Sequence, residues 1–373
     1  MNITYEWIED IDRFKEIAAG WDKAVESSGS HDPFLLSDFV ISWSKYFGGK
    51  DPLRALVVYG GKDIIGGIPL CLKRGSRPYS FVKILCHVGG SAANYTEPFY
   101  AFRDIDILPV IREALSEKKD WDLLYLSDLR RENKLLGELS GSGADKCFSV
   151  KVLTDHSNWS IDLSAGLEKY LSGIPSKLKR DLRSKRKHLE QKFGPVRLRE
   201  VKGGDVAKLI DDYSKLSLNS FSERGRESSF ESREYAAFYG EFLMAMEAKD
   251  RLDAHLLCAG EEPLAISFGY RFGPGFNWVL TGFNSKHKYY RPGYLLIEEL
   301  IKLVASRGET IYNWYGYERF YKAQWCNRQD PLYKVFILRR SVKVGLYHLI
   351  NSIERAIRSN NMIVAAVRKI RRS

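Results

Sequence analysis

The chain has 373 residues, a formal net charge of +11 from 58 Lys and Arg against 47 Asp and Glu, and 44% hydrophobic residues. This length predicts two domains, and the composition excludes global disorder and collagen-like or low-complexity chains. Five scattered cysteines without a C-x-x-C pair argue against a disulfide framework or zinc ribbon, and they favour a reduced, cytosolic protein. We find no apolar run long enough to span a bilayer and no signal-peptide pattern at the N-terminus.

The first half of the chain predicts a mixed α/β domain over residues 1–155. Apolar spacing predicts the helices, and runs of β-branched and aromatic residues predict the strands. The expected elements are, in order, a helical entry over 4–30, a helix over 38–47, strands over 53–59 and 64–72 joined by a glycine turn, a strand over 81–88, a helix over 104–118 and a strand over 121–127.

The second half predicts another α/β domain over residues 156–345. Its hairpin LLCAGEEPLAISFGY resembles VVYGGKDIIGGIPL of the first half, which indicates that the two halves share a topology. The expected elements are strands over 149–154 and 159–163, helices over 176–193, 205–219 and 232–249, strands over 252–260, 262–272 and 276–283, a helix over 294–306, and strands over 310–315 and 332–340. Residues 346–373 predict a basic amphipathic tail helix.

Positive charge gathers in two segments of the chain. Residues 176–199 carry ten Lys and Arg against two acids, and residues 339–373 carry nine against one, so the remainder of the chain is mildly acidic. This pattern favours an anionic partner, such as a phosphate-bearing cofactor, RNA or an anionic lipid surface. A solvated helix face is the alternative interpretation of each run. The tail helix either packs on the body or lies on an acidic membrane face.

The loop NSKHKYYRPG after the strand 276–283 has the chemistry of an anion site. Pro292 is suited to begin a helix, and Gly293 permits close approach to the main chain. Free N–H groups and the positive end of the helix dipole favour a bound anion, and a pyrophosphate would fit. Lys286, Lys288 and Arg291 add positive charge. An ordinary strand–loop–helix connection is the alternative.

The run GYERFYKAQW, residues 316–325, places a carboxylate, phenols and an ammonium at the end of a strand. Ends of neighbouring strands are where α/β folds build sites, so Glu318, Tyr321 and Lys322 are candidate proton carriers. An aromatic-rich helix start is the alternative. The seven histidines show no metal-ligand spacing, so we predict no metal site. We also find no serine-hydrolase or P-loop motif.

These segments together resemble the CelD-like branch of the GNAT acyltransferase superfamily, which is related to the FemABX transferases. The resemblance spans roughly residues 20–340, and it rests on the order and spacing of its motifs. The motifs are PFLLSDFVISW, GGIPLCL, KLKRDLRSKRKHLE, GEEPLAISFGY, NWVLTGFNSKHKYYRPGYLLIEELI and YNWYGYERFYKAQW. The common GNAT loop has Gln or Arg and a second small residue where Tyr290 and Leu295 stand here.

The resemblance implies two tandem GNAT-like domains and an acyl-CoA donor, typically acetyl-CoA. In this fold two parallel strands diverge, here Phe276–Phe283 and Thr310–Tyr315, and the pantetheine arm pairs with one of them. The residues that the resemblance assigns to the cofactor are Lys288, Arg291, Gly293, Tyr294, Leu295 and Leu296, with the pyrophosphate on the main-chain N–H groups of 293–296.

The resemblance also implies catalytic roles for residues near the last strands. Glu318 is expected to act as the base and Tyr321 as the acid that protonates the thiolate. Lys322 is expected to polarise the carbonyl or bind an acidic acceptor. The segment NYTE, residues 94–97, resembles a family element that faces the cleft, so Tyr95 and Glu97 are candidate acceptor contacts, although a loop that caps strand ends is the alternative. Trp325 is a further candidate.

We therefore expect an acyl-CoA-dependent N-acyltransferase that acts on an amino sugar or another small amine, and the resemblance associates it with cell-envelope or exopolysaccharide synthesis. The runner-up is a FemABX-like transferase that uses aminoacyl-tRNA, which the basic helix 176–193 would suit. A third hypothesis is a non-catalytic scaffold. The expected location is cytoplasmic, with peripheral contact at the inner membrane face through residues 346–373.

Overall fold

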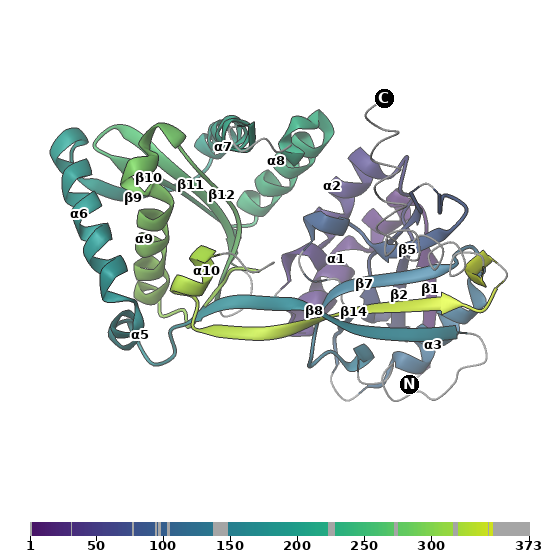
Figure 1. The fold of residues 1–373 in the computed structure, drawn as a ribbon. Coiled ribbons are helices and arrows are strands. Elements are labelled where there is room, and N and C mark those ends of the chain that lie inside the picture. The colour runs from purple at the N-terminus through teal and green to yellow at the C-terminus, as the bar shows by residue number, and fades with distance from the viewer. Residues whose placement is uncertain are drawn as a thin grey trace, which may run out of the picture.

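The computed structural model describes residues 2–30, 32–76, 78–93, 95, 98–102, 105–136, 148–222, 228–271, 275–315, 320–341 and 343–345. Its helices and strands form the mixed α/β arrangement that the sequence predicts (Figure 1). The predicted tail helix 346–373 lies outside these residues. The α-helices are α1 (Ile11–Ser27), α2 (Ser37–Phe47), α3 (Leu108–Glu117), α5 (Leu167–Gly173), α6 (Ser176–Phe193), α7 (Asp205–Ser222), α8 (Arg233–Ala248), α9 (Pro292–Ser306) and α10 (Phe320–Trp325).

The strands form two sheets. The smaller sheet has the order β1-β2-β3-β6, and the larger has the order β4-β5-β7-β14-β8-β13-β12-β11-β10-β9. The strands are β1 (Ile3–Ile8), β2 (Ala55–Gly60), β3 (Asp63–Ile68), β4 (Leu70–Arg74), β5 (Lys83–His87), β6 (Phe99–Tyr100), β7 (Leu123–Arg130), β8 (Phe148–Asp162), β9 (Val196–Val201), β10 (Leu252–Ala259), β11 (Glu262–Arg271), β12 (Gly275–Phe283), β13 (Ile311–Asn313) and β14 (Arg328–Arg339).

The predicted helical entry over 4–30 is wrong in its first residues. Ile3–Ile8 form strand β1, which pairs antiparallel with β2, and the helix begins only at Ile11. The apolar spacing of this segment fits a helix, but its β-branched and aromatic residues suit a strand once β2 offers a partner. Asp10 ends the extended segment and caps α1 by accepting a hydrogen bond from the Asp12 N–H.

Two long strands join the halves of the molecule. β8 and β14 pair antiparallel along most of their lengths and run side by side across the centre of the view in Figure 1. β14 also pairs with β7, so a strand from the end of the described chain completes the sheet of the first half. The two predicted strands at 149–154 and 159–163 are therefore one strand. The predicted domain division at residue 155 falls within β8 and stays a prediction.

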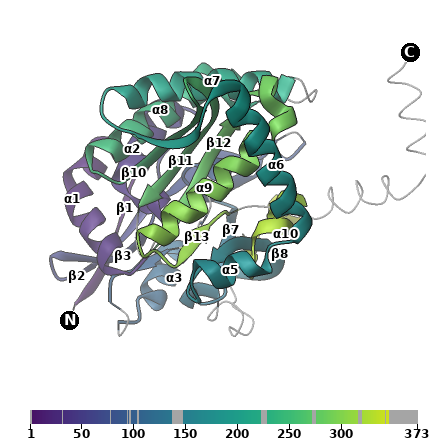
Figure 2. The same ribbon diagram turned by 90° about the vertical axis from the view of Figure 1, so that its left-hand side faces the viewer.

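Hydrophobic cores lie on both faces of the larger sheet. One core joins the halves directly, because Phe39 of α2 packs against Phe238 and Phe242 of α8. A second core lies where α6 and α9 cover β10–β13, with α9 crossing in front of the sheet in Figure 2. Its members on α9 follow helical spacing and are Leu295, Leu296, Ile297, Leu300, Ile301 and Val304.

Among the described residues, the helices lack the combination of length and apolar character that a membrane span requires.

Candidate active site

The parallel strands β12 and β13 pair briefly and then separate. Their opposed pairs are Gly275 with Ile311, Phe276 with Tyr312, and Asn277 with Asn313. β12 continues to Phe283, whereas β13 ends at Asn313. The edge of β12 beyond Asn277 therefore faces an opening in the sheet, where main-chain N–H and C=O groups can pair with an extended ligand. The parallel pairing that the resemblance implied is present over these three pairs, and β13 is shorter than the predicted strand 310–315.

Tyr315 turns the chain away from β12. Its φ of 46° lies in the left-handed region, which is strained for a residue other than glycine. Its hydroxyl donates to Asn277 Oδ1 at 2.7 Å. The buried Lys322 Nζ donates to the main-chain carbonyls of Trp314, at 3.3 Å, and of Tyr315. These contacts hold the strained turn and tie it to β12 through Asn277.

Aromatic side chains pack together where the pairing of β12 with β13 ends. The ring of Trp278, the first β12 residue after the paired segment, lies 4.8 Å from the ring of Trp314. Trp278 is only 7% exposed, and its Nε1 has no hydrogen-bond partner among the described residues. An unpaired buried N–H costs about 1–3 kcal/mol. The Trp278 N–H is therefore a donor that a ligand carbonyl could satisfy at the divergence of the strands.

Helix α9 begins at the predicted anion site, at the far end of β12. The N-cap Arg291 is left-handed, with a φ of 53°. Its carbonyl accepts from the N–H groups of Tyr294 at 2.9 Å and Leu295 at 3.2 Å. In the first turn of α9, the N–H of Gly293 therefore has no main-chain acceptor within the described part of the chain. A Cβ on Gly293 would meet only Phe283 Cδ1, at 3.6 Å, so packing alone does not require glycine there.

The charges beside this helix start are partly paired. Arg291 Nε lies 3.2 Å from a carboxylate oxygen of Asp181 on α6. Arg186 of the same helix contacts Glu298 and Glu299 of α9, at 2.9 and 2.7 Å. Figure 2 shows α6 beside α9, as these contacts require. The basic helix thus has a structural face toward α9, while Lys288 and several lysines and arginines of α6 remain exposed.

Short helix α10 carries three of the predicted residues, and two of them, Tyr321 and Lys322, lie beside the end of β13. The ring of Tyr321 lies 5.9 Å from that of Trp314, and Lys322 contacts the end of β13 as described above. Trp325 is 2% exposed, and its Nε1 also has no hydrogen-bond partner in the described structure. The hydroxyl of Tyr294 donates to Gln324 Oε1 at 2.9 Å, which ties α10 to the start of α9. Glu318 and Glu97 lie outside the described residues.

A chain of buried amides crosses the strands on the opposite face of the sheet. Asn158 Nδ2 donates to Asn313 Oδ1 at 2.9 Å, and Asn313 Nδ2 contacts Asn277 Oδ1 and the Tyr95 hydroxyl, both at 3.4 Å. Tyr95 therefore contacts β13, and its role as an acceptor contact stays a prediction. The sequence contains a signal for this network that our prediction missed, because an Asn-Trp pair occurs three times, at residues 158–159, 277–278 and 313–314.

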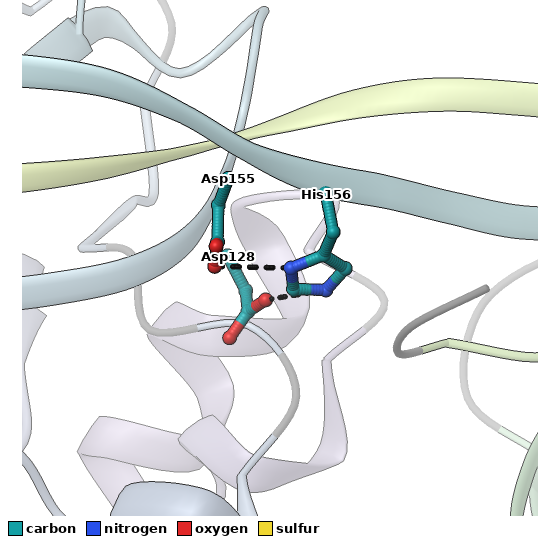
Figure 3. Close-up of side chains that lie close together, drawn as sticks. All are labelled: Asp128, Asp155 and His156. Atoms are coloured by element: carbon teal, nitrogen blue, oxygen red, sulfur yellow. Dashed lines mark ion pairs between the residues drawn. The ribbon is translucent and has the colours of Figure 1, made fainter. Parts of the chain in front are cut away.

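An ion-pair cluster lies near Asn158 along β8, where β8 pairs with β14 (Figure 3). His156 of β8 lies 3.0 Å from Asp128 of β7 through Nε2 and 3.0 Å from the neighbouring Asp155 through Nδ1. Their potential ligand atoms lie within 4.8 Å of one another, close enough to hold a metal ion. However, Lys334 of β14 already contacts Asp155 at 2.5 Å. With His156 protonated, two cations balance two carboxylates, so the side chains form a neutral cluster that joins three strands.

Irregular pairing on both sides of β14 creates this cluster. The register shifts between Tyr333 and Val335 opposite β7, where Asp128 has a left-handed φ of 59°. A second shift, between Pro331 and Tyr333, lies opposite Asp155 and His156 of β8. Bulges re-aim side chains and often lie next to functional sites. Here they turn the three side chains toward one another.

We predict that the cluster makes stability depend on pH. Hydrogen bonding to Asp128, followed by the charges of both carboxylates, raises the pKa of His156 against the opposing effect of burial. A raised pKa in the folded state adds stability that is fully present below the unfolded value of about 6.5 and is lost as pH rises through the folded value. Urea unfolding should show that the free energy of unfolding of the wild type falls as pH rises above about 6.5, and that His156→Gln lacks this fall. The same dependence on pH in both proteins would contradict the prediction.

Comparisons with known proteins agree with this geometry. Residues 176–323 match the family model described as acetyltransferase (GNAT) domain. The structure of FemX aligns with this chain at a TM-score of 0.60 and 11% sequence identity. The alignment covers 92% of this chain and 99% of FemX. The C-terminal domain of a proposed lysylphosphatidylglycerol synthetase from Agrobacterium fabrum has a TM-score of 0.54 and 11% identity, with coverages of 92% and 97%.

A third structure, a conserved protein of unknown function from Bacteroides thetaiotaomicron, has a TM-score of 0.52 and 10% identity, with coverages of 90% and 100%. No curated protein matches the sequence. At these identities the likeness concerns the fold, and it confirms the predicted GNAT-like architecture of mixed sheets flanked by helices. The CelD-like branch stays a prediction.

Proposed function

We propose that the chain is an acyl-CoA-dependent N-acyltransferase, with acetyl-CoA as the simplest donor and an amino sugar or another small amine as the acceptor. The observation that carries the proposal is the divergence of β12 from β13, followed directly by the start of α9. The exposed edge of β12 would pair with the extended pantetheine arm. The Gly293 N–H and the positive end of the α9 dipole would hold the pyrophosphate, with Lys288 and Arg291 beside it.

The reaction would be a direct transfer between two bound substrates. The amine nitrogen attacks the thioester carbonyl, so a C–N bond forms and the C–S bond breaks. The amine loses one proton and the departing thiolate gains one, which yields the amide and free CoA. We assign Tyr321 as the acid that protonates the thiolate and Glu318 as the base. We assign Lys322 to positioning, because its ammonium binds the carbonyls that end β13.

Replacing the unpaired indole of Trp278 tests the donor site. The variant Trp278→Phe keeps an aromatic ring but removes the N–H that we propose to donate to the pantetheine or thioester carbonyl. We expect acetyl-CoA affinity, measured by calorimetric titration, to fall about tenfold, the equivalent of one hydrogen bond. Binding of acetyl-CoA by the wild-type chain is the first requirement of the proposal.

Trp43→Phe is the matched control for this experiment. Trp43 also carries a buried Nε1 without a hydrogen-bond partner within the described residues, but it packs against Phe47 and Phe238 in the core between α2 and α8. Its replacement should alter thermal stability and leave acetyl-CoA affinity unchanged. Equal affinities in the two variants would show that the Trp278 N–H does not contact the donor.

The exposed basic face of α6 supports a second candidate donor, an aminoacyl-tRNA. This face carries Lys177, Arg180, Arg183, Lys187 and Lys192, all solvent-exposed. Phosphate contacts make such binding fall steeply with salt, whereas binding of a small CoA depends on salt more weakly. Titration of aminoacyl-tRNA and acetyl-CoA at two salt concentrations separates the two donors. If neither aminoacyl-tRNA nor acetyl-CoA binds, the result favours the scaffold hypothesis.

A role in envelope or exopolysaccharide synthesis, with membrane contact through 346–373, remains part of the proposal.

A further inference from the structure

A cavity of about 840 Å³ lies against β8, β13 and β14, on the face of the sheet that carries the buried amides. Helix α9 packs on the other face, against Phe276 and Tyr312. Asn277 and Asn313, the next residues along the same strands, point the opposite way. The cavity and the proposed donor cleft therefore occupy opposite faces of the sheet, and Asn313, which lines the cavity, is the last residue of β13 that pairs with β12. A volume of this size suits a small molecule.

The mouth of the cavity is rich in cations. Arg130, Arg131, Lys134 and Arg328 line it, against the two acids Glu132 and Asp330. Arg328 is already paired with Asp330, at 2.8 Å. The Arg130 guanidinium lies over the ring of Tyr95, 5.0 Å from its centroid, and Lys134 Nζ lies 5.9 Å from the Tyr100 centroid. These ring contacts hold two cations at the cavity wall, and the excess positive charge favours an anionic ligand.

The floor of the cavity offers a hydrogen-bond acceptor. Asn158 lines the cavity and is 5% exposed. Its Nδ2 donates a hydrogen bond to Asn313 Oδ1, but its own Oδ1 has no hydrogen-bond partner among the described residues. A buried carbonyl oxygen of this kind requires a donor, and an amine or hydroxyl group of a ligand would supply one. Asn313 and Asn277 continue this chain of amides to the point where β12 and β13 diverge.

We propose that this cavity binds the acceptor, and that the acceptor is a small amine that also carries an acidic group such as a phosphate. The acidic group would lie at Arg130 and Arg131, and the amine would donate to Asn158 Oδ1 at the inner end. This inference rests on the proposed function for its chemistry. The amine attacks the thioester carbonyl across the opening, the C–N bond forms as the C–S bond breaks, and the proton lost by the amine balances the one gained by the thiolate.

Binding of matched probes in the absence of CoA tests the cavity directly. We choose glucosamine 6-phosphate, glucosamine and glucose 6-phosphate, each titrated calorimetrically at low salt into the full chain. The phosphorylated amine should bind at least about tenfold more tightly than glucosamine, the effect of one charge-assisted contact. It should also bind more tightly than glucose 6-phosphate, because its protonated amine forms a charge-assisted hydrogen bond with Asn158 Oδ1, whereas the hydroxyl forms a weaker neutral one. Absence of any preference for the phosphate at millimolar concentrations would overturn the proposal.

Two variants locate the contacts. Arg130→Met should remove most of the preference for phosphate, and Asn158→Leu should remove the preference for the amine over the hydroxyl. Arg197→Met, on the exposed surface of β9, is the matched control and should change neither. Thermal unfolding of each variant establishes that it folds. Retention of both preferences in Arg130→Met and Asn158→Leu would contradict the assignment.

The two proposals can fail separately. If acetyl-CoA binds but the probes show no phosphate preference, the donor site stands and the acceptor cavity does not. If glucosamine 6-phosphate binds and responds to Arg130→Met while acetyl-CoA does not bind, the cavity stands and the donor assignment fails. Amide formation from acetyl-CoA and glucosamine 6-phosphate, detected by mass spectrometry, would support both the donor site and the acceptor cavity.

Discussion

Gly293→Glu should abolish acetyl-CoA binding. The new carboxylate would stand at the start of α9, where we place the pyrophosphate, and it would meet like charge at a few ångströms. Such a contact costs about 4 kcal/mol near a protein surface, which corresponds to a loss of roughly a thousandfold in affinity. The side chain itself has room, because a Cβ at Gly293 makes only an ordinary contact with Phe283. Calorimetric titration measures the effect.

Two further variants separate charge from bulk and position. Gly293→Gln adds the same volume without the charge and should bind acetyl-CoA far better than Gly293→Glu. Gly49→Glu adds the same charge at a distant glycine with open space around it, and it should bind like the wild type. If Gly293→Glu retains wild-type affinity, the pyrophosphate does not lie at this helix start, and the assignment of Lys288 and Arg291 fails with it.

Local patterns predict the long elements of this chain well. Helix α6 has the predicted bounds, 176–193, because its apolar residues Leu178, Leu182 and Leu189 recur at helical spacing and Gly194 follows. Strand β9, by contrast, was not predicted. Its sequence VRLREV carries three charges, and it lies at the edge of the sheet, where its two valines are buried and its charged side chains are exposed.

The site itself depends on contacts between distant segments. The parallel pairing of β12 with β13 is implied by the family resemblance, but the left-handed conformation of Tyr315, two residues after β13, has no local signature. The Asn-Trp pairs acquire meaning only through register, which sets Asn277 opposite Asn313 and brings Asn158 beside them. Register between strands far apart in sequence cannot be read from either strand alone. The cavity likewise combines residues from separate segments of the chain.

Tyr321→Phe should slow the chemical step and leave donor binding intact. The hydroxyl is the group we assign to protonate the departing thiolate, and general acid catalysis contributes about 10²–10⁴-fold to rate. We therefore expect kcat to fall at least about a hundredfold, with the acetyl-CoA Kd within about threefold of wild type. The phenyl ring should keep its place against Trp314, since the ring contact does not involve the hydroxyl.

Tyr333→Phe, on β14 and away from α10, is the control for loss of a phenol elsewhere in the fold. Parallel losses of kcat and acetyl-CoA affinity in Tyr321→Phe would assign the hydroxyl to binding, because an interaction made only in the transition state lowers kcat without changing ground-state affinity. An unchanged kcat would remove Tyr321 as the acid and leave the thiolate to be protonated by solvent.

Because Lys322 holds the carbonyls of Trp314 and Tyr315, Lys322→Met should instead lower stability and donor affinity together, which distinguishes a positioning residue from the acid beside it.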